Sequence, residues 1–224
     1  MTHPLDRPIW SALNSRQAPL AIRSGGAIRF APEYTPFGAC DDAAPDSFAA
    51  LKALAAQHGD IIVVEADPLL PPGIDAFAYP ALVQMIWAGG PPPPAPEFAF
   101  SELDDADADE MRELALLTRP GPYSTRTHRL GGFIGVRREG RLIAMSGERM
   151  KPDGFTEVSG VCTHPDHRGQ GLAAGLMGEV IRRILARGET PFLHAYAENT
   201  GAIALYESLG LAIRRPMVML GITG

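Results

Sequence analysis

The sequence predicts an α/β protein whose mixed central sheet is flanked by helices. The first observation is an alternation, in which short runs rich in Val, Ile and Thr are separated by segments whose apolar residues recur at helical spacing. The second is a strand, a glycine loop and an amphipathic helix that follow one another within residues 157–186. A sheet with helices packed on it buries both kinds of apolar surface.

The composition is that of a folded protein without a basic surface. The 224 residues suffice for one large domain or two small ones, and 46% are hydrophobic, which argues against disorder. The net charge is -6, and neither the residues before 91 nor those after have a basic excess, so we expect no nucleic-acid partner. No apolar run is long enough to span a bilayer, and the first residues lack the apolar core of a signal peptide. Cys40 and Cys162 form no metal-ligand pattern and no disulfide framework, so we expect a cytoplasmic protein without a metal or a membrane partner.

Residues 1–90 are predicted to form a smaller α/β part. They contain no glycine loop and no cluster of chemically reactive residues. The sequence leaves open whether this part is a degenerate copy of the C-terminal fold or a separate α/β part, and what its role is. Asp46 and Ser47 are suited to cap its longer helix. The expected elements are a helix at 8–14, a strand at 25–31, a loop at 37–45, a helix at 48–58 and strands at 61–65 and 79–87.

A proline-rich stretch marks the boundary to the second part. Residues 91–96 read Pro-Pro-Pro-Pro-Ala-Pro, and consecutive prolines favour a stiff, extended linker. Residues 97–224 then form the larger domain. Its expected strands are 98–103, 133–137, 141–148, 156–163, 192–197 and 211–220, the last broken near Pro216, and its helices are 111–117, 172–186 and 199–209.

An acidic cluster stands just before the first helix of this domain. It comprises Asp104, Asp105, Asp107, Asp109 and Glu110. Acidic side chains are favoured at helix N-termini by the helix dipole, and we prefer this interpretation to a binding site for a cationic acceptor.

The glycine loop predicts a site for a phosphate or pyrophosphate. The N-terminus of the helix from Leu172 offers unpaired backbone N–H groups and a partial positive charge. Gly169 and Gly171 allow an anion to approach the backbone, and Arg168 adds a forked donor beside them. A structural turn that merely requires glycine is the alternative.

Three kinds of phosphate-binding loop are candidates. A P-loop requires Lys-Ser or Lys-Thr after its last glycine, and this loop has neither. Gly169, Gly171 and Ala174 fit a dinucleotide-binding pattern, with Glu189 at the distance of a ribose-binding acid, but Glu189 precedes the next strand instead of closing it.

The third kind fits best. The sequence Arg168-x-x-Gly171-x-Ala173 resembles the coenzyme A loop of the GNAT superfamily of N-acyltransferases. A second block, residues 199–210 with Asn199 and Tyr206, also resembles that superfamily and follows at the expected distance. The resemblance extends from about residue 98 to residue 224.

The resemblance implies an N-acetyltransferase that moves an acetyl group from acetyl-CoA to an amine by direct transfer through a ternary complex. The acceptor is a small-molecule amine or a protein amine, and residues 119–129 correspond to the acceptor loop of the superfamily. The oligomeric state stays open, a homodimer included. The implied cofactor-binding residues are Val161, Cys162, Thr163, Arg168, Gly169, Gln170, Gly171, Leu172, Ala173, Ala174 and Asn199.

The resemblance also implies two catalytic residues. Tyr206 corresponds to the residue that protonates the leaving thiolate, and Glu157 to a general base. The alternatives are a core tyrosine in line with Ile203 and Leu209, and a structural strand carboxylate. A Cys162–His164 nucleophile is disfavoured because the flanking residues indicate a buried thiol. A catalytically silent binding module of the same fold is the alternative function, and a dinucleotide-binding protein is less favoured.

Overall fold

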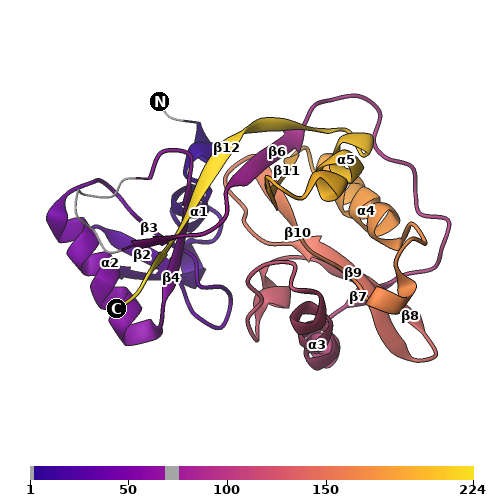
Figure 1. Ribbon diagram of the computed structural model, residues 1–224, viewed down its shortest axis with the longest axis horizontal. Coiled ribbons are helices and arrows are strands. Elements are labelled where there is room, and N and C mark those ends of the chain that lie inside the picture. Colours follow the sequence, from indigo (N-terminus) through magenta and orange to yellow (C-terminus); the bar gives the residue numbers. More distant parts are fainter. Residues whose placement is uncertain (1–2, 69–75) are drawn as a thin grey trace.

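The computed structural model of the protein describes residues 3–68 and 76–224. Figure 1 shows two unequal halves joined by long strands, with both chain ends in the half that contains the N-terminal residues. Mixed strands and helices confirm the predicted α/β class.

The N-terminal half contains a small antiparallel sheet with two helices against it. Its strands pair in the order β1-β2-β3. The small sheet is continued by a parallel bridge from Phe37 to Ile62. The elements that precede the proline-rich stretch in sequence are α1 (Pro8–Leu13), β1 (Ala21–Ser24), β2 (Ala27–Phe30), β3 (Gly38–Cys40), α2 (Pro45–His58), β4 (Ile61–Glu65), β5 (Ala76–Ala78) and β6 (Leu82–Trp87).

Two expectations for this half are wrong. Residues 37–45 are not only loop, because β3 lies within them and pairs with β2. Helix α2 begins at Pro45, and its N-cap residue makes no side-chain cap hydrogen bond. The Ser47 hydroxyl instead donates to Asp41 and Asp42, while Pro45, which has no N–H to satisfy, opens the helix.

The larger half follows the predicted order of strands and helices. Its elements are β7 (Ser101–Leu103), α3 (Ala108–Thr118), β8 (Phe133–Arg138), β9 (Arg141–Glu148), β10 (Phe155–Thr163), α4 (Leu172–Ala186), β11 (Thr190–Tyr196), α5 (Thr200–Ser208) and β12 (Leu211–Ile222). Strand β12 is one continuous strand, and its register shift lies between Ile213 and Arg215, just before Pro216.

One sheet crosses the predicted boundary at residues 91–96. Its order is β4-β12-β6-β11-β10-β9-β8-β7, and β5 also pairs with β12. Strand β6 precedes the proline-rich stretch in sequence, yet it lies between β11 and β12. Strand β12 runs from the larger half into the N-terminal half, where it pairs with β4 (Figure 1). The two halves are therefore joined by backbone hydrogen bonds as well as by the linker.

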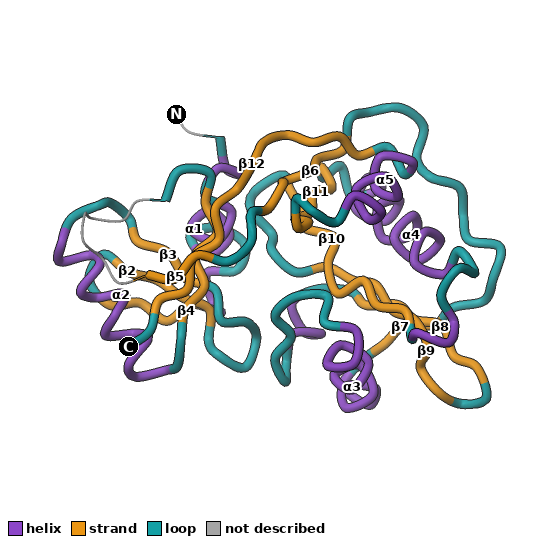
Figure 2. Tube along the Cα trace, in the orientation of Figure 1, coloured by secondary structure: helices purple, strands orange, loops and turns teal. Residues whose placement is uncertain are grey.

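Helices cover both faces of the larger sheet. Figure 2 shows α4 and α5 side by side on one face and α3 on the other. The apolar row predicted for α4 is buried, and Leu176 and Ile181 are fully inaccessible. Each such side chain contributes roughly 1.5–3 kcal/mol through burial. On the opposite face, Met111 and Leu114 of α3 pack on Met145 and neighbouring strand residues.

The proline-rich stretch packs on helix α4. A Cβ built at Gly178 would lie 3.2 Å from Pro93, and one at Gly175 would lie 2.6 Å from the Phe98 ring. These two glycines let the chain pass directly over the helix. The stretch therefore holds α4 against the sheet in addition to linking the two halves.

Candidate active site

The candidate site lies where strands β10 and β11 separate. They pair in parallel only from Phe155–Thr190 to Glu157–Phe192. Beyond that point β10 stays with β9, while β11 pairs with β6. The ends of the two strands therefore diverge.

A bulge in β10 widens this opening. Between the pairs Ser159–Gly147 and Cys162–Met145, β10 advances three residues while β9 advances two, so β10 holds one extra residue. Gly160 lies in this bulge with φ of 63°, and a Cβ there would lie 2.6 Å from Phe133. The position therefore requires glycine, and the bulge turns backbone groups of Gly160 and Val161 out of the ladder.

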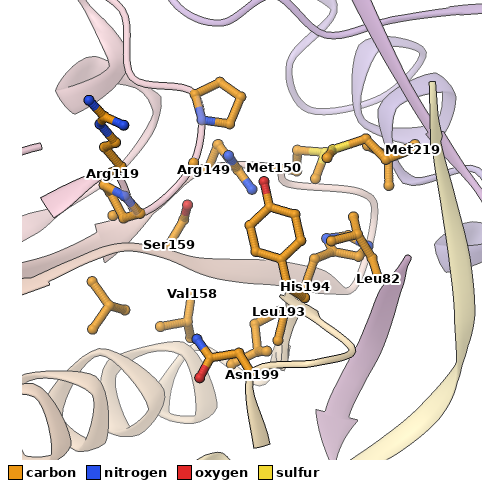
Figure 3. Close-up of a pocket in the computed structure, with 18 of the residues that line it drawn as sticks. Leu82, Arg119, Arg149, Met150, Val158, Ser159, Leu193, His194, Asn199 and Met219 are labelled. Atoms are coloured by element: carbon orange, nitrogen blue, oxygen red, sulfur yellow. The ribbon is translucent and has the colours of Figure 1, made fainter. Parts of the chain in front are cut away.

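A cavity of about 260 Å³ occupies the opening (Figure 3). The site is built from both halves of the protein, since Phe37, Val64 and Leu82 reach it from before the linker. The remaining lining residues are Thr118, Arg119, Pro120, Gly121, Pro122, Arg149, Met150, Val158, Ser159, Gly160, Val161, Leu193, His194, Ala195, Tyr196, Asn199, Tyr206 and Met219. Four of them, residues 119–122, belong to the loop predicted to line the acceptor site.

The glycine loop leads from β10 to the N-terminus of α4. Gly169 and Gly171 have φ values of 74° and 73°, which other residues rarely adopt, and a Cβ at either would meet nothing within 4 Å. The space beside the loop is therefore open for a bound group.

The start of α4 offers donors for an anion. Gly171 is its N-cap and provides no side-chain cap, and the first helical hydrogen bond runs from Gly175 N–H to the Gly171 carbonyl. The N–H groups of Leu172, Ala173 and Ala174 precede that bond. Arg168 is exposed and forms no ion pair with any described residue, and Gln170 beside it is exposed as well. Loop and helix together fit a pyrophosphate, because backbone N–H groups and a guanidinium are what it requires.

Tyr206 and Asn199 place a second group of polar atoms at the cavity. Tyr206 reaches it from α5, and its hydroxyl bonds to no described residue. Burial raises the pKa of Tyr206, so the phenol keeps its proton at neutral pH. Asn199 caps α5, since its Oδ1 accepts from the Ala202 N–H at 3.2 Å, and it also lines the cavity. The helix predicted at 199–209 is confirmed, with Asn199 as its N-cap.

Glu157 is fully buried beneath the cavity. Arg149 donates to its carboxylate through Nε at 2.8 Å and Nη2 at 2.9 Å, and the Met150 N–H adds a longer bond of 3.3 Å. Burial by itself would raise the pKa of Glu157, but the charge of Arg149 and the hydrogen bonds from Arg149 and His194 lower it to about 2. The carboxylate is therefore ionised and has all its acceptor positions in use.

The hydrogen bonds fix the tautomer of His194. The Gln84 carbonyl oxygen accepts from Arg214 at 2.9 Å, so the Gln84 amide nitrogen is the atom that donates to the Leu5 carbonyl and to His194 Nε2. His194 therefore accepts at Nε2 and donates from Nδ1 to Glu157 at 2.9 Å. The ring is neutral and has no free lone pair for the cavity.

This geometry argues against Glu157 as a general base. Its carboxylate does not line the cavity, it is already saturated with donors, and its low pKa makes it a weak base. Its place in the fold is that of a residue that orients Arg149 and His194, both of which do line the cavity.

Cys162 and Thr163 follow the bulge and do not line the cavity. Cys162 is buried under α3, and burial raises the pKa of its thiol to about 12. It forms no hydrogen bond with His164, whose Nδ1 accepts from the Asp166 N–H, so a Cys–His nucleophile is not assembled. The buried Thr163 hydroxyl has no partner in the described chain.

The position of Glu189 argues against the dinucleotide alternative. Glu189 lies beyond the opposite end of α4, where it binds the Thr156 hydroxyl and pairs with Arg16 and Arg187. It is therefore not available to a ribose at the glycine loop.

The acidic cluster before α3 also has structural partners. Asp104 caps the turn at Asp105–Asp107, Asp105 binds His128 and Arg129, and Asp107 and Glu110 pair with Arg137. The preferred interpretation, acidic residues at a helix start, is confirmed.

Most residues that line the cavity carry no motif, and three of them, Arg149, His194 and Phe37, bear on its chemistry. Arg149 and His194 belong to no motif. Phe37 is 112 positions from Arg149 in the sequence, yet the Arg149 guanidinium lies 4.8 Å from the centroid of the Phe37 ring. No local signal predicts such contacts. Among the described residues, no three His, Cys, Asp or Glu side chains are arranged to hold a metal ion, and no helix has the length and apolar character needed to cross a bilayer.

Comparison with known proteins agrees with this architecture. The family described as FR47-like protein matches residues 133–218. A candidate acetyltransferase of the GNAT family from Novosphingobium aromaticivorans is 45% identical, with a TM-score of 0.87 and full coverage of both chains. The protein therefore belongs to the GNAT family, as the two motifs predicted. A search of curated proteins found no match.

More distant structures share the fold. A GCN5-related N-acetyltransferase from Kribbella flavida is 18% identical, with a TM-score of 0.62 over 96% of this chain and 93% of its own. A tandem GNAT protein from the clavulanic acid biosynthesis pathway is also 18% identical, with a TM-score of 0.56 over 90% of this chain and 81% of its own. Both likenesses extend across most of the chain, the N-terminal half included.

Proposed function

We propose that the protein is an N-acetyltransferase that binds acetyl-CoA and transfers the acetyl group directly to an amine in a ternary complex. The observation that carries the proposal is the cavity at the opening between β10 and β11. It adjoins the strand leading to the glycine loop and is also lined by Tyr206. A thioester and an amine have to meet in one such space for direct transfer.

The residues of the loop fit the phosphates of the cofactor. The N–H groups at the start of α4, Arg168 and the open space at Gly169 and Gly171 bind the pyrophosphate. The unpaired backbone of Gly160 and Val161 receives the pantetheine arm. When bound, acetyl-CoA supplies the thioester whose carbonyl carbon is the electrophile.

The residues at the opening support each stage of the transfer. In this proposal, backbone N–H groups of the bulge donate to the thioester oxygen as the amine nitrogen forms its bond to the carbonyl carbon, and the register shift in β10 supports this role. As the carbon–sulfur bond breaks, the Tyr206 hydroxyl gives its proton to the sulfur. The nitrogen loses its proton to water, and water restores the Tyr206 proton. Glu157 takes no proton in this scheme.

A two-part assay tests the proposal. Calorimetry measures binding of coenzyme A, and a thiol-release assay with acetyl-CoA is run across a panel of amines. We expect micromolar or tighter binding and amine-dependent release. Binding without release for every amine would favour the catalytically silent binding module, and NADH binding without coenzyme A binding would contradict the assignment of the loop.

A further inference from the structure

The charged side chains of the cavity all have one sign. Its described lining includes the guanidinium groups of Arg119 and Arg149 and no carboxylate. Glu157, the acid that pairs with Arg149, is fully buried and does not line the cavity. Arg149 is paired with Glu157, whereas Arg119 has no ion-pair partner among the described residues. A cationic acceptor would therefore meet guanidinium groups and no carboxylate on the described lining, which is unfavourable.

Arg149 keeps an unused donor edge. Arg149 is only 9% exposed, and its Nε and Nη2 atoms donate to Glu157. Nη1 bonds to no acceptor in the described chain, and a Cβ built at Gly121 would lie 4.0 Å from it. Glu157 and the ring of Phe37 fix the guanidinium plane of Arg149. Its free Nη1 edge therefore faces the loop of residues 119–122 and can donate to an anionic acceptor group.

The second cation lies at the rim. Arg119 is exposed, forms no ion pair among the described residues, and ends helix α3 with a φ of 51°. In Figure 3, Arg119 and Arg149 are drawn on the side of the cavity away from Asn199. The two cations therefore lie away from the end of the cavity where α5 begins.

The walls around these donors are apolar. Phe37, Leu82, Met150 and Met219 line the same cavity, and three of the four come from the N-terminal half or from the strand β12 that enters it. An acceptor that fills this space has to present apolar surface to these side chains.

We propose that the acceptor is a primary amine that also carries a carboxylate and an apolar body, and that Arg149 Nη1 and Arg119 bind the carboxylate. This inference rests on the proposed function. The same positive charges disfavour an ammonium group, so they help the bound amine to lose its proton although no general base lines the cavity.

Matched acceptors test the preference. The panel contains L-leucine, L-leucinamide and isoamylamine, then 6-aminohexanoate, 6-aminohexanamide and hexylamine, with cadaverine as a dication. The first three compounds form one series and the next three another. In at least one series we expect kcat/KM for the carboxylate to exceed kcat/KM for the matching amide and for the matching alkylamine by roughly tenfold or more. We expect cadaverine to be the slowest. The inference would be overturned if an amide, a plain alkylamine or cadaverine had a higher kcat/KM than both carboxylates.

Variants of the two arginines localise the effect. Arg119→Gln should lower kcat/KM for the preferred carboxylate by up to about fivefold, mainly through KM, and leave its amide unchanged. Arg149→Lys should have a larger effect in the same direction. Arg112→Gln, on the exposed surface of α3 and outside the cavity lining, is the matched control. Equal losses for carboxylate and amide would contradict the assignment.

A binding measurement separates this inference from the proposed function. In the presence of coenzyme A, hexanoate should raise the melting temperature more than hexanamide, and Arg119→Gln should reduce that difference. This readout requires no turnover, so it applies even if no amine releases thiol. Equal shifts with hexanoate and hexanamide would overturn the inference, whereas absence of thiol release alone would overturn only the proposed function.

Discussion

The glycine loop, which does not line the cavity, and the buried side of the cavity obtain their polar groups in different ways. On the loop side, the groups are mostly backbone N–H groups within residues 168–174, and most of that segment is exposed. On the buried side the polar groups are side chains. Arg149 and His194 line the cavity, Glu157 behind them binds both, and Gln84 continues the hydrogen bonds to Leu5.

A substitution in the glycine loop leaves most of the backbone donors in place, whereas a substitution in the buried side removes a hydrogen-bonding side chain. A backbone site depends on a conformation, so it is sensitive only where glycine is required. A buried polar network depends on every partner, because an unpaired charge in the interior is costly. The loop side should therefore tolerate many substitutions that alter affinity without unfolding, while the buried side should couple function to stability.

The largest effect is expected from removing the centre of the network. Glu157→Ala leaves Arg149 and His194 without their shared acceptor, and breaking a buried pair in this way costs about 3–5 kcal/mol. Urea unfolding monitored by circular dichroism measures the loss. Glu113→Ala, an exposed carboxylate on α3, is the control and should change stability by less than about 0.5 kcal/mol. Equal, small effects would mean that the network contributes little.

Acid should act on the same carboxylate without any substitution. The pKa of Glu157 is about 2 in the folded protein and 4.5 in a model peptide, so the unfolded chain binds the proton more readily. Its contribution, about 3 kcal/mol, is fully present above pH 4.5 and is lost as the pH falls toward 2. Unfolding free energies measured across this range should fall more steeply in the wild type than in Glu157→Gln. Parallel curves would contradict the assigned pKa.

The acid role of Tyr206 should appear as a loss of turnover alone. Tyr206→Phe keeps the ring contacts of α5 and removes only the proton donor, so kcat should fall about a hundredfold with coenzyme A affinity almost unchanged. Tyr196→Phe is the matched control, because Tyr196 also lines the cavity but belongs to β11. A greater loss in the control would transfer the role to Tyr196.

On the loop side, a single glycine should decide cofactor affinity. Gly171→Glu adds backbone strain at a φ of 73° and a negative charge beside the proposed pyrophosphate site, which should weaken coenzyme A binding by roughly 2 kcal/mol, about thirtyfold. Gly188→Glu carries the same strain, with a φ of 74° and open space, just beyond the C-terminal end of α4. Calorimetry should show normal affinity for this control. Equal losses in the two variants would mean that strain alone is responsible.

The smallest effect is expected where the N-terminal half touches the network. Phe37→Leu removes the ring under the Arg149 guanidinium, a contact that contributes about 0.5–1 kcal/mol. We expect KM for the amine to rise by up to about fivefold while coenzyme A affinity stays constant. A change in coenzyme A affinity instead would show that the two sides are not separable.

The loop side could be predicted from sequence because its signals are local. Helix α4 matches the expected 172–186 because its apolar rows are regular, and the N-cap Gly171 marks its start. Asn199 identifies the start of α5 by the same rule. The order of elements in 97–224 could likewise be predicted, since each strand carries its own pattern.

The buried side could not be predicted because its contacts join distant segments. Glu157 alternates with its neighbours as any strand residue does, and only the pairing of β10 with β11 places it against His194. The position of β6 inside the larger sheet has no signal in residues 82–87 themselves. Composition predicts a domain boundary at 91–96. It carries no information about the pairing of β12 with β4 and β6, which precede that stretch.

The insertion of β6 between β11 and β12 also bears on how the chain folds. Strands β8, β9 and β10 are sequential hairpin partners, so their pairing closes short loops and can occur early. Strand β6 can pair only after β11 has formed, and β11 lies more than a hundred residues further along the chain. The hydrogen bond from Arg214 to Asp6 joins residues that are 208 positions apart. We therefore expect the surroundings of the glycine loop to become ordered first, and the wall that selects the acceptor to be completed in the slowest step of folding.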